Sequence, residues 1–307
     1  MRNVAWLIGV ASAIGFAAWL IGGWGGKSTV EVVDDLGLVG FALFATVCSG
    51  FAALKSSGRQ RVAWICFSIG TGGWVVGSAL WAYYELWAGV APFPSLADAG
   101  YLVLPVAVCV GLVLFPVGYT GQSQTRLVLD GLIFAGALFE VAWVLVLRTI
   151  YETGGASRFA VGLSLAYPVT DLVIITVAVM VLARARTGQR TTLTLLAVGI
   201  VSMALSDSAF VYLNAHGVYS TVNLIDLGWA AGLVLIGVAA LISCGFAPAT
   251  DAATPQPPNQ VSMWLPYVPT CWPPWFACRR SSPYPDWAPL SSRPSCWSPS
   301  CWCGSSS

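Results

Sequence analysis

Long apolar stretches alternate with short polar connections through the first four-fifths of the chain. A helix needs about 20 mostly apolar residues to cross a bilayer, and the unbroken runs favour helices over the alternating strands of a membrane barrel. The pattern predicts an all-α, polytopic transmembrane helical bundle of about eight spans within residues 1–244. The expected spans are approximately 4–24, 36–54, 62–84, 98–117, 127–147, 161–182, 192–213 and 224–244.

Composition supports a lipid environment, because 57% of the residues are hydrophobic and only 9% are charged. The formal net charge is +1, so the chain lacks the strongly basic surface that binds nucleic acid. We therefore expect the lipid bilayer as a partner and no nucleic acid. A homodimer is left open by the sequence.

Basic residues in the connections predict the orientation, since cytoplasmic loops carry an excess of Lys and Arg. Both ends of the bundle are expected to face the cytoplasm, in the plasma membrane. The first run lacks a convincing cleavage site and is expected to stay as an anchor. Eight basic residues fall on the side predicted to be cytoplasmic and three on the other: Arg2, Lys55, Arg59, Arg61, Arg126, Arg184, Arg186 and Arg190 against Lys27, Arg148 and Arg158.

Five carboxylates are predicted in the outer half of the bundle. An ionisable group in a span is costly and suggests a function or a buried pairing. The functional interpretation is an outward-facing polar pocket, closed by aromatic side chains, for a cation, an amine or a polar small ligand. The aromatic residues expected to close it are Trp81, Tyr83, Tyr84, Tyr101, Tyr212 and Trp229. The five residues are Glu85, Asp98, Asp171, Asp207 and Asp226.

Helix capping is the competing interpretation for some of these acids. Ser95 and Asp98 have the spacing of a capping box, and carboxylates stabilise the positive end of a helix. We favour capping for Asp98 and Asp226, which begin predicted helices. Asp171 and Asp207 lie farther from a helix end, so the pocket interpretation carries more weight for them.

A transport function is the alternative class. A path through Asp130, Glu140 and Asp171 would suit a small-solute or ion transporter. Such paths usually involve discontinuous helices or symmetric repeats, and the related hint in this chain is Pro168, ahead of Asp171.

No enzyme motif is recognisable, so we expect no catalysis by this chain and no cofactor, metal or catalytic residue. The single histidine, His216, is predicted to be a solvated loop residue. Two pairs of glycines, Gly73 with Gly77 and Gly228 with Gly232, are typical of close helix packing.

The sequence changes character near Thr270, after which Cys, Trp, Pro and Ser dominate. Five cysteines follow without a Cys-x-x-Cys pair, in a segment predicted to be cytoplasmic, which disfavours a disulfide framework or a zinc site. With GC-rich codons chosen by us, a shift of one reading frame converts Thr270–Trp275 into LLAAVV. We expect a cytoplasmic linker at 245–263 and, at 264–307, an aberrant, frameshifted tail without a fold. Sequencing the gene across this codon tests the hypothesis, since an intact frame excludes it.

Several short motifs resemble one protein family. They are Trp74, Trp81–Glu85, Pro92–Leu102, Asp130–Ile133, Tyr167–Leu172, Ser206–Asp207 and Asp226–Trp229. Together they look like the multi-span N-terminal module of actinobacterial cyclic-di-GMP signalling proteins, over most of residues 36–268. The most distinctive part is the Pro-Phe-Pro-Ser-Leu-Ala-Asp run that begins at Pro92.

In that family, the module usually precedes cytoplasmic diguanylate cyclase domains, often with a phosphodiesterase domain after them. The resemblance therefore implies a membrane sensory or anchoring module of a signal-transduction protein that regulates cyclic-di-GMP turnover. This chain is expected to be truncated before any output domain, so no catalytic residue is carried over.

Overall fold

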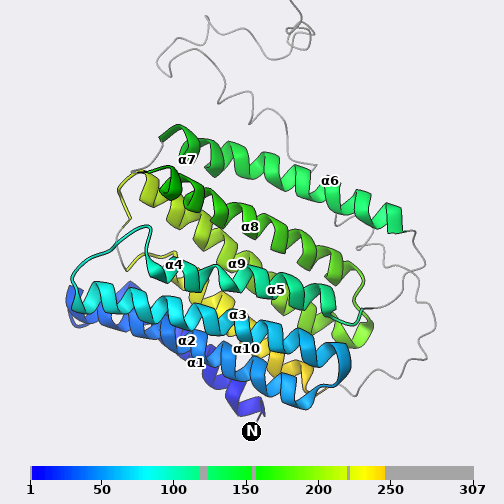
Figure 1. Ribbon diagram of the computed structural model, residues 1–307. Coiled ribbons are helices and arrows are strands. Elements are labelled where there is room, and N and C mark those ends of the chain that lie inside the picture. The colour runs from blue at the N-terminus through cyan, green and yellow to red at the C-terminus, as the bar shows by residue number, and fades with distance from the viewer. Residues whose placement is uncertain (1, 118–123, 154–156, 220–221, 246–307) are drawn as a thin grey trace, which may run out of the picture. The chain divides into compact units, whose positions relative to one another are not determined.

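The computed structural model describes residues 2–117, 124–153, 157–219 and 222–245 (Figure 1). Within these ranges the protein is built from helices and contains no strand, which confirms the predicted all-α class. The predicted linker, apart from Gly245, and the predicted tail lie outside the described residues.

Ten α-helices form the described part of the chain. Two π-helical turns, Tyr83–Trp87 and Trp143–Leu147, follow α3 and α6, and a short 3-10 turn, Thr187–Gln189, precedes α9. The α-helices are α1 (Arg2–Gly22), α2 (Lys27–Lys55), α3 (Gly58–Ala82), α4 (Leu96–Tyr101), α5 (Val103–Leu114), α6 (Gln124–Ala142), α7 (Arg148–Thr153), α8 (Arg158–Ala183), α9 (Arg190–Ala215) and α10 (Asp226–Ser243).

Seven helical segments of the described chain are long and apolar enough to cross a membrane, which indicates a membrane-embedded protein. The apolar stretch Trp6–Gly22 of α1 is shorter. All eight predicted runs coincide with helices, but seven is the number of spans that length and composition support. The seven segments are Lys27–Lys55, Gly58–Trp87, Leu96–Leu114, Leu129–Thr153, Arg158–Ala183, Arg190–Ala215 and Asp226–Ser243.

Two helix boundaries differ from the prediction. The second helix was expected from residue 36, but α2 begins at Lys27, where Lys27 and Glu31 form an i,i+4 ion pair of 3.6 Å. The predicted span 98–117 is divided at Leu102 into α4 and α5. The prediction placed both boundaries at the edges of continuous hydrophobic runs, whereas a helix can extend beyond such a run or be divided within it.

Six helices pack in a closed ring. In order around the ring, α2 contacts α3, α3 contacts α5, α5 contacts α8, α8 contacts α9, α9 contacts α10, and α10 returns to α2. The remaining long helices lie outside the ring, where α1 packs on α2 and α10, and α6 packs on α8 (Figure 1). The ring places residues from six separate parts of the sequence around one interior.

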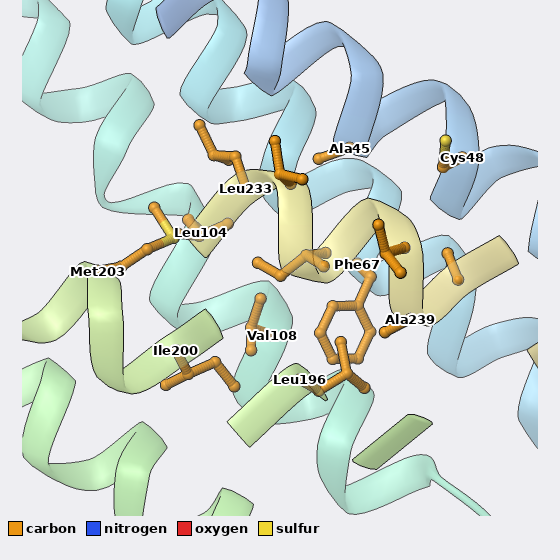
Figure 2. Close-up of a cluster of buried hydrophobic side chains, with 14 of the residues drawn as sticks. Ala45, Cys48, Phe67, Leu104, Val108, Leu196, Ile200, Met203, Leu233 and Ala239 are labelled. Carbon is orange, nitrogen blue, oxygen red and sulfur yellow. The ribbon is translucent and has the colours of Figure 1, made fainter. Parts of the chain in front are cut away.

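The apolar core lies where α10 meets its neighbours. In α10, 72% of the most apolar stretch is buried, against 6% in the segment Leu129–Thr153 outside the ring. Figure 2 shows side chains from α2, α3, α5 and α9 packed around this helix; the labelled residues are Ala45, Cys48, Phe67, Leu104, Val108, Leu196, Ile200, Met203, Leu233 and Ala239. Burial of these apolar side chains stabilises the packing of α10 against its neighbouring helices.

Close approach of helix backbones confirms the packing role predicted for the glycine pairs. A Cβ at Gly100 of α4 would lie 2.6 Å from the Gly77 nitrogen and 2.8 Å from the Gly73 oxygen of α3. At α10, a Cβ on Gly232 would meet the Gly199 carbonyl oxygen of α9 at 2.8 Å. Both glycine pairs therefore hold helices of the same chain together.

Hydrogen bonds identify which connections share an end of the bundle. Arg59 Nη2 donates to the Val113 carbonyl oxygen (3.4 Å), and Gln189 Nε2 donates to the Pro116 carbonyl oxygen (2.8 Å). The α2–α3 and α8–α9 connections thus lie together at one end of the bundle. We call it the basic end, because these connections and the helix ends beside them carry Lys55, Arg59, Arg61, Arg184, Arg186 and Arg190. At the opposite end, Asp34 Oδ2 accepts the Val222 N–H (3.1 Å), which joins α2 to the segment before α10.

Candidate functional site

The six ring helices enclose a cavity of about 80 Å³. One water molecule needs about 10–15 Å³ on this measure, so the cavity has room for several waters or a small solute. Among the described residues that line it there is no Lys, Arg or His. Six aspartates line it instead: Asp34, Asp35, Asp98, Asp171, Asp207 and Asp226.

Four of the five predicted site residues meet at this cavity. Asp98, Asp171, Asp207 and Asp226 line it, although they come from α4, α8, α9 and α10. Glu85 does not line it, but its Oε2 accepts a hydrogen bond from Nε1 of Trp81 (2.9 Å), a residue of the cavity wall.

The aromatic residues predicted to close the pocket divide in the same way. Trp81, Tyr101 and Trp229 line the cavity. Tyr83, Tyr84 and Tyr212 are not among the lining residues.

The prediction missed Asp34 and Asp35, which it placed in an outer connection. Both lie in the third turn of α2, with only 1% and 4% of their surface exposed. Their burial follows from the early start of α2. The available signal was the apolar spacing of Val30 and Val33 ahead of them, which extends the helical pattern toward Lys27.

Asp98 caps its helix and also lines the cavity. Its Oδ2 accepts the Ser95 N–H (2.6 Å) while the Ser95 hydroxyl accepts the Ala97 N–H (3.2 Å), which confirms the predicted capping box. Its Oδ1 accepts the Tyr167 hydroxyl of α8 (2.6 Å). The capping residue therefore also joins α4 to α8, and it lines the cavity.

Asp226 also stabilises the start of its helix. Its Oδ2 accepts the N–H of Asn223, three residues earlier, at 2.6 Å. Asp34 lies beside it, and the two carboxyl groups are close enough to share a proton. A proton shared by Asp34 and Asp226 would leave this pair with one negative charge instead of two.

Asp171 and Asp207 form a second pair on α8 and α9. Asp207 Oδ1 accepts a hydrogen bond from Trp229 Nε1 (2.8 Å), and ionised Asp207 would repel ionised Asp171. Asp171 Oδ2 is buried and has no hydrogen-bond partner within the described structure, as is Asp35 Oδ2 on α2. Together with Asp34 Oδ1, these are the carboxylate oxygens in the described cavity wall that are buried without a partner.

Aromatic rings pack together in and beside the cavity wall. Trp74 packs against Tyr101 (ring centroids 5.0 Å apart) and against Trp229 (6.3 Å). Phe210 packs on Tyr219 (4.8 Å), which belongs to the segment after α9. Burial raises the pKa of Tyr219, so this phenol keeps its proton and remains a hydrogen-bond donor.

Of the three residues of the transport hypothesis, only Asp171 lines the cavity. Asp130 and Glu140 belong to α6, outside the ring, and neither lines the cavity. Glu140 is exposed on that helix. Pro168 lies inside α8, one turn before Asp171, where it removes one backbone donor from the helix.

The arrangement of acids differs from that of a metal centre. Over the part of the chain that the structure describes, no three His, Cys, Asp or Glu side chains are placed to hold a metal ion. His216 is exposed at the end of α9, as predicted, with Nδ1 2.7 Å from the Tyr212 carbonyl oxygen.

Comparison of the chain with family models, curated proteins and solved structures finds no match.

Proposed function

We propose that this chain is a membrane sensory module whose cavity receives a small ligand and whose output is cyclic-di-GMP turnover. The observation that carries the proposal is the collection of six aspartates, with no basic residue among the described lining residues, inside a ring of apolar helices. Carboxylates at membrane depth are costly, and they persist where a ligand or ion uses them.

The signalling context rests on the resemblance to the module of cyclic-di-GMP proteins. The proposed setting is the plasma membrane, with the basic end in the cytoplasm, since that end carries the excess of Lys and Arg. The cavity would then be reached from the outer side, next to the segment that contains Tyr219 and Val222.

A ligand can pass a signal inward only if it binds one helix arrangement better than another. Helix α10 is the proposed carrier, because it begins at Asp226 beside the cavity and runs to Ser243 at the opposite end. It contacts α1, α2 and α9, so a shift of α10 changes its packing against both of its neighbours in the ring, α2 and α9.

A reporter fusion tests this function. A diguanylate cyclase domain attached after residue 263 would report the state of the module through the cyclic-di-GMP level in cells. We expect Asp171→Asn to change that level by about fivefold or more, within the usual range of coupling energies. Glu140→Gln is the control, because Glu140 is an intramembrane carboxylate outside the cavity. Equal levels in the two variants, at equal membrane insertion, would exclude the proposal.

Transport of a small solute or ion remains the second candidate, favoured by Pro168 one turn before Asp171 in α8. The chain reconstituted in vesicles would then show solute flux that Asp171→Asn abolishes. A sensory module shows no flux in the same vesicles, whichever variant is used.

A further inference from the structure

We propose that the cavity binds a short aliphatic diamine in its doubly protonated form, with one ammonium group at Asp35 and the other at Asp171. The inference rests on the proposed function, in that it names the ligand class of the same cavity. It is carried by the position of two unsatisfied oxygens and by the character of the wall between them.

The two carboxylates lie on different walls of the ring. Helix α2, which holds Asp35, packs against α1, α3 and α10, whereas α8, which holds Asp171, packs against α5, α6, α7 and α9. Asp35 lies among the acids Glu31, Asp34 and Glu85, whereas Asp171 lies beside Asp207. The cavity thus has two separate anionic regions.

Each anionic region contains a carboxylate oxygen that the protein leaves unpaired, and in the α2 region Asp34 Oδ1 is unpaired as well as Asp35 Oδ2. Asp35 Oδ2 and Asp171 Oδ2 have no hydrogen-bond partner in the described structure, and their side chains belong to residues that are 4% and 9% exposed. A buried carboxylate oxygen without a donor is costly. An ammonium group supplies both a donor and the opposite charge.

The remaining acids of the wall already have partners. Asp98 accepts from Ser95 and Tyr167, and Asp207 accepts from Trp229. Asp226 accepts from Asn223 and lies close enough to Asp34 to share a proton. The unpaired oxygens therefore fall on two helices, with Asp34 Oδ1 and Asp35 Oδ2 on α2 and Asp171 Oδ2 on α8. Asp34 already accepts the Val222 N–H through its Oδ2, so we assign the ammonium group on α2 to Asp35.

The wall between the two regions suits a hydrocarbon chain. Tyr101 lines the cavity near both regions, since it interacts electrostatically with Asp35 and with Asp207, and its ring packs on Trp74. Leu104 and Met203 add aliphatic surface to the same cavity. Methylene groups bind such surface, and the faces of Trp74 and Tyr101 attract cations.

Other cations match these features less well. A divalent metal needs several oxygens converging on one point, and no such group of three is present among the described residues. A monoamine would satisfy one of the two oxygens and leave the other unpaired. A cavity of about 80 Å³ has the capacity for a chain of a few methylene groups with an ammonium at each end.

Calorimetric titration of the purified full chain in detergent tests the proposal, with 1,4-diaminobutane and 1-aminobutane as probes. We expect the diamine to bind at least about tenfold more tightly than the monoamine, because only the diamine pairs both oxygens. Asp35→Asn and Asp171→Asn should each weaken diamine binding by about tenfold or more, to the level of the monoamine. Glu140→Gln should leave the affinity unchanged.

Equal affinity for the two probes, or no heat of binding to the diamine by folded protein, would overturn the proposal. The comparison of probes uses the unsubstituted chain, so it decides the question even where an Asn variant does not fold. If the diamine does not bind while Asp171→Asn still changes the reporter level, the ligand class is wrong and the sensory function stands. If the diamine binds but the reporter does not respond, the sensory function fails and the ligand class stands.

Discussion

At the scale of single residues, Asp98 combines helix capping with a position on the cavity wall. One oxygen caps α4 through Ser95, and the other accepts the Tyr167 hydroxyl from α8. A capping carboxylate can therefore also set the distance between two helices that border a cavity. Asp226 similarly accepts the Asn223 N–H at the start of α10 and lies beside Asp34 of α2.

Removing the Tyr167 hydroxyl should show what this connection contributes. In Tyr167→Phe, Asp98 Oδ1 loses its donor while the residue stays buried, so we expect the free energy of unfolding to fall by about 1–3 kcal/mol. Thermal unfolding in detergent measures the change. Tyr83→Phe is the matched control, because Tyr83 is 56% exposed. Identical stabilities of the two variants would show that the Asp98–Tyr167 hydrogen bond contributes nothing.

The sequence predicted the residues whose signal is local. Ser95 and Asp98 have capping-box spacing, and the structure contains that box. Asp35 could not be predicted in the same way, because its burial depends on the ring that α2 joins, not on its own neighbours in sequence. Adjacent acids before an apolar run resemble a solvated connection unless the tertiary structure is known.

At the scale of helices, hydrophobic runs predicted which elements exist, and backbone geometry decided where they end. The division at Leu102 lies next to the point where Gly100 of α4 meets Gly77 and Gly73 of α3. Helices can approach so closely only where side chains are absent. The contact also places Asp98 and Tyr101 beside α3 at the cavity.

Gly100→Ala should therefore be more damaging than an ordinary Gly-to-Ala change. The new methyl group would lie within 2.6–2.8 Å of the α3 backbone, so we expect a loss of about 1–3 kcal/mol in the free energy of unfolding. Gly136→Ala in α6, where no atom lies within 4 Å of the added carbon, is the control. It should be neutral or stabilising by up to about 1 kcal/mol. Equal thermal stability of both variants contradicts the close packing of α3 and α4.

At the scale of the whole molecule, the ring is the feature that the sequence did not predict. Apolar runs of similar length give no indication that α1 and α6 lie outside while six other helices surround the cavity. The acids could be assigned to one half of the bundle by counting spans, because consecutive helices alternate in direction. Their meeting at one cavity depends on which helices are neighbours, and that information lies in long-range contacts.

The most direct test of the account is whether a thiol inside the cavity can be modified from outside intact cells. Thr170→Cys places the thiol on the cavity wall beside Asp171. Ser49→Cys is the control, because Ser49 is 0% exposed and does not line the cavity. The unsubstituted chain gives the background from its natural cysteines.

Two membrane-impermeant methanethiosulfonates, one with a trimethylammonium group and one with a sulfonate group, report access and charge together. The account predicts that Thr170→Cys reacts from outside and that the cationic reagent is faster by about tenfold or more, relative to free thiols, because the acidic wall attracts cations. Ser49→Cys should stay unmodified. Failure of Thr170→Cys to react from the outer side, or equal rates with both reagents, would contradict an outward-facing acidic site.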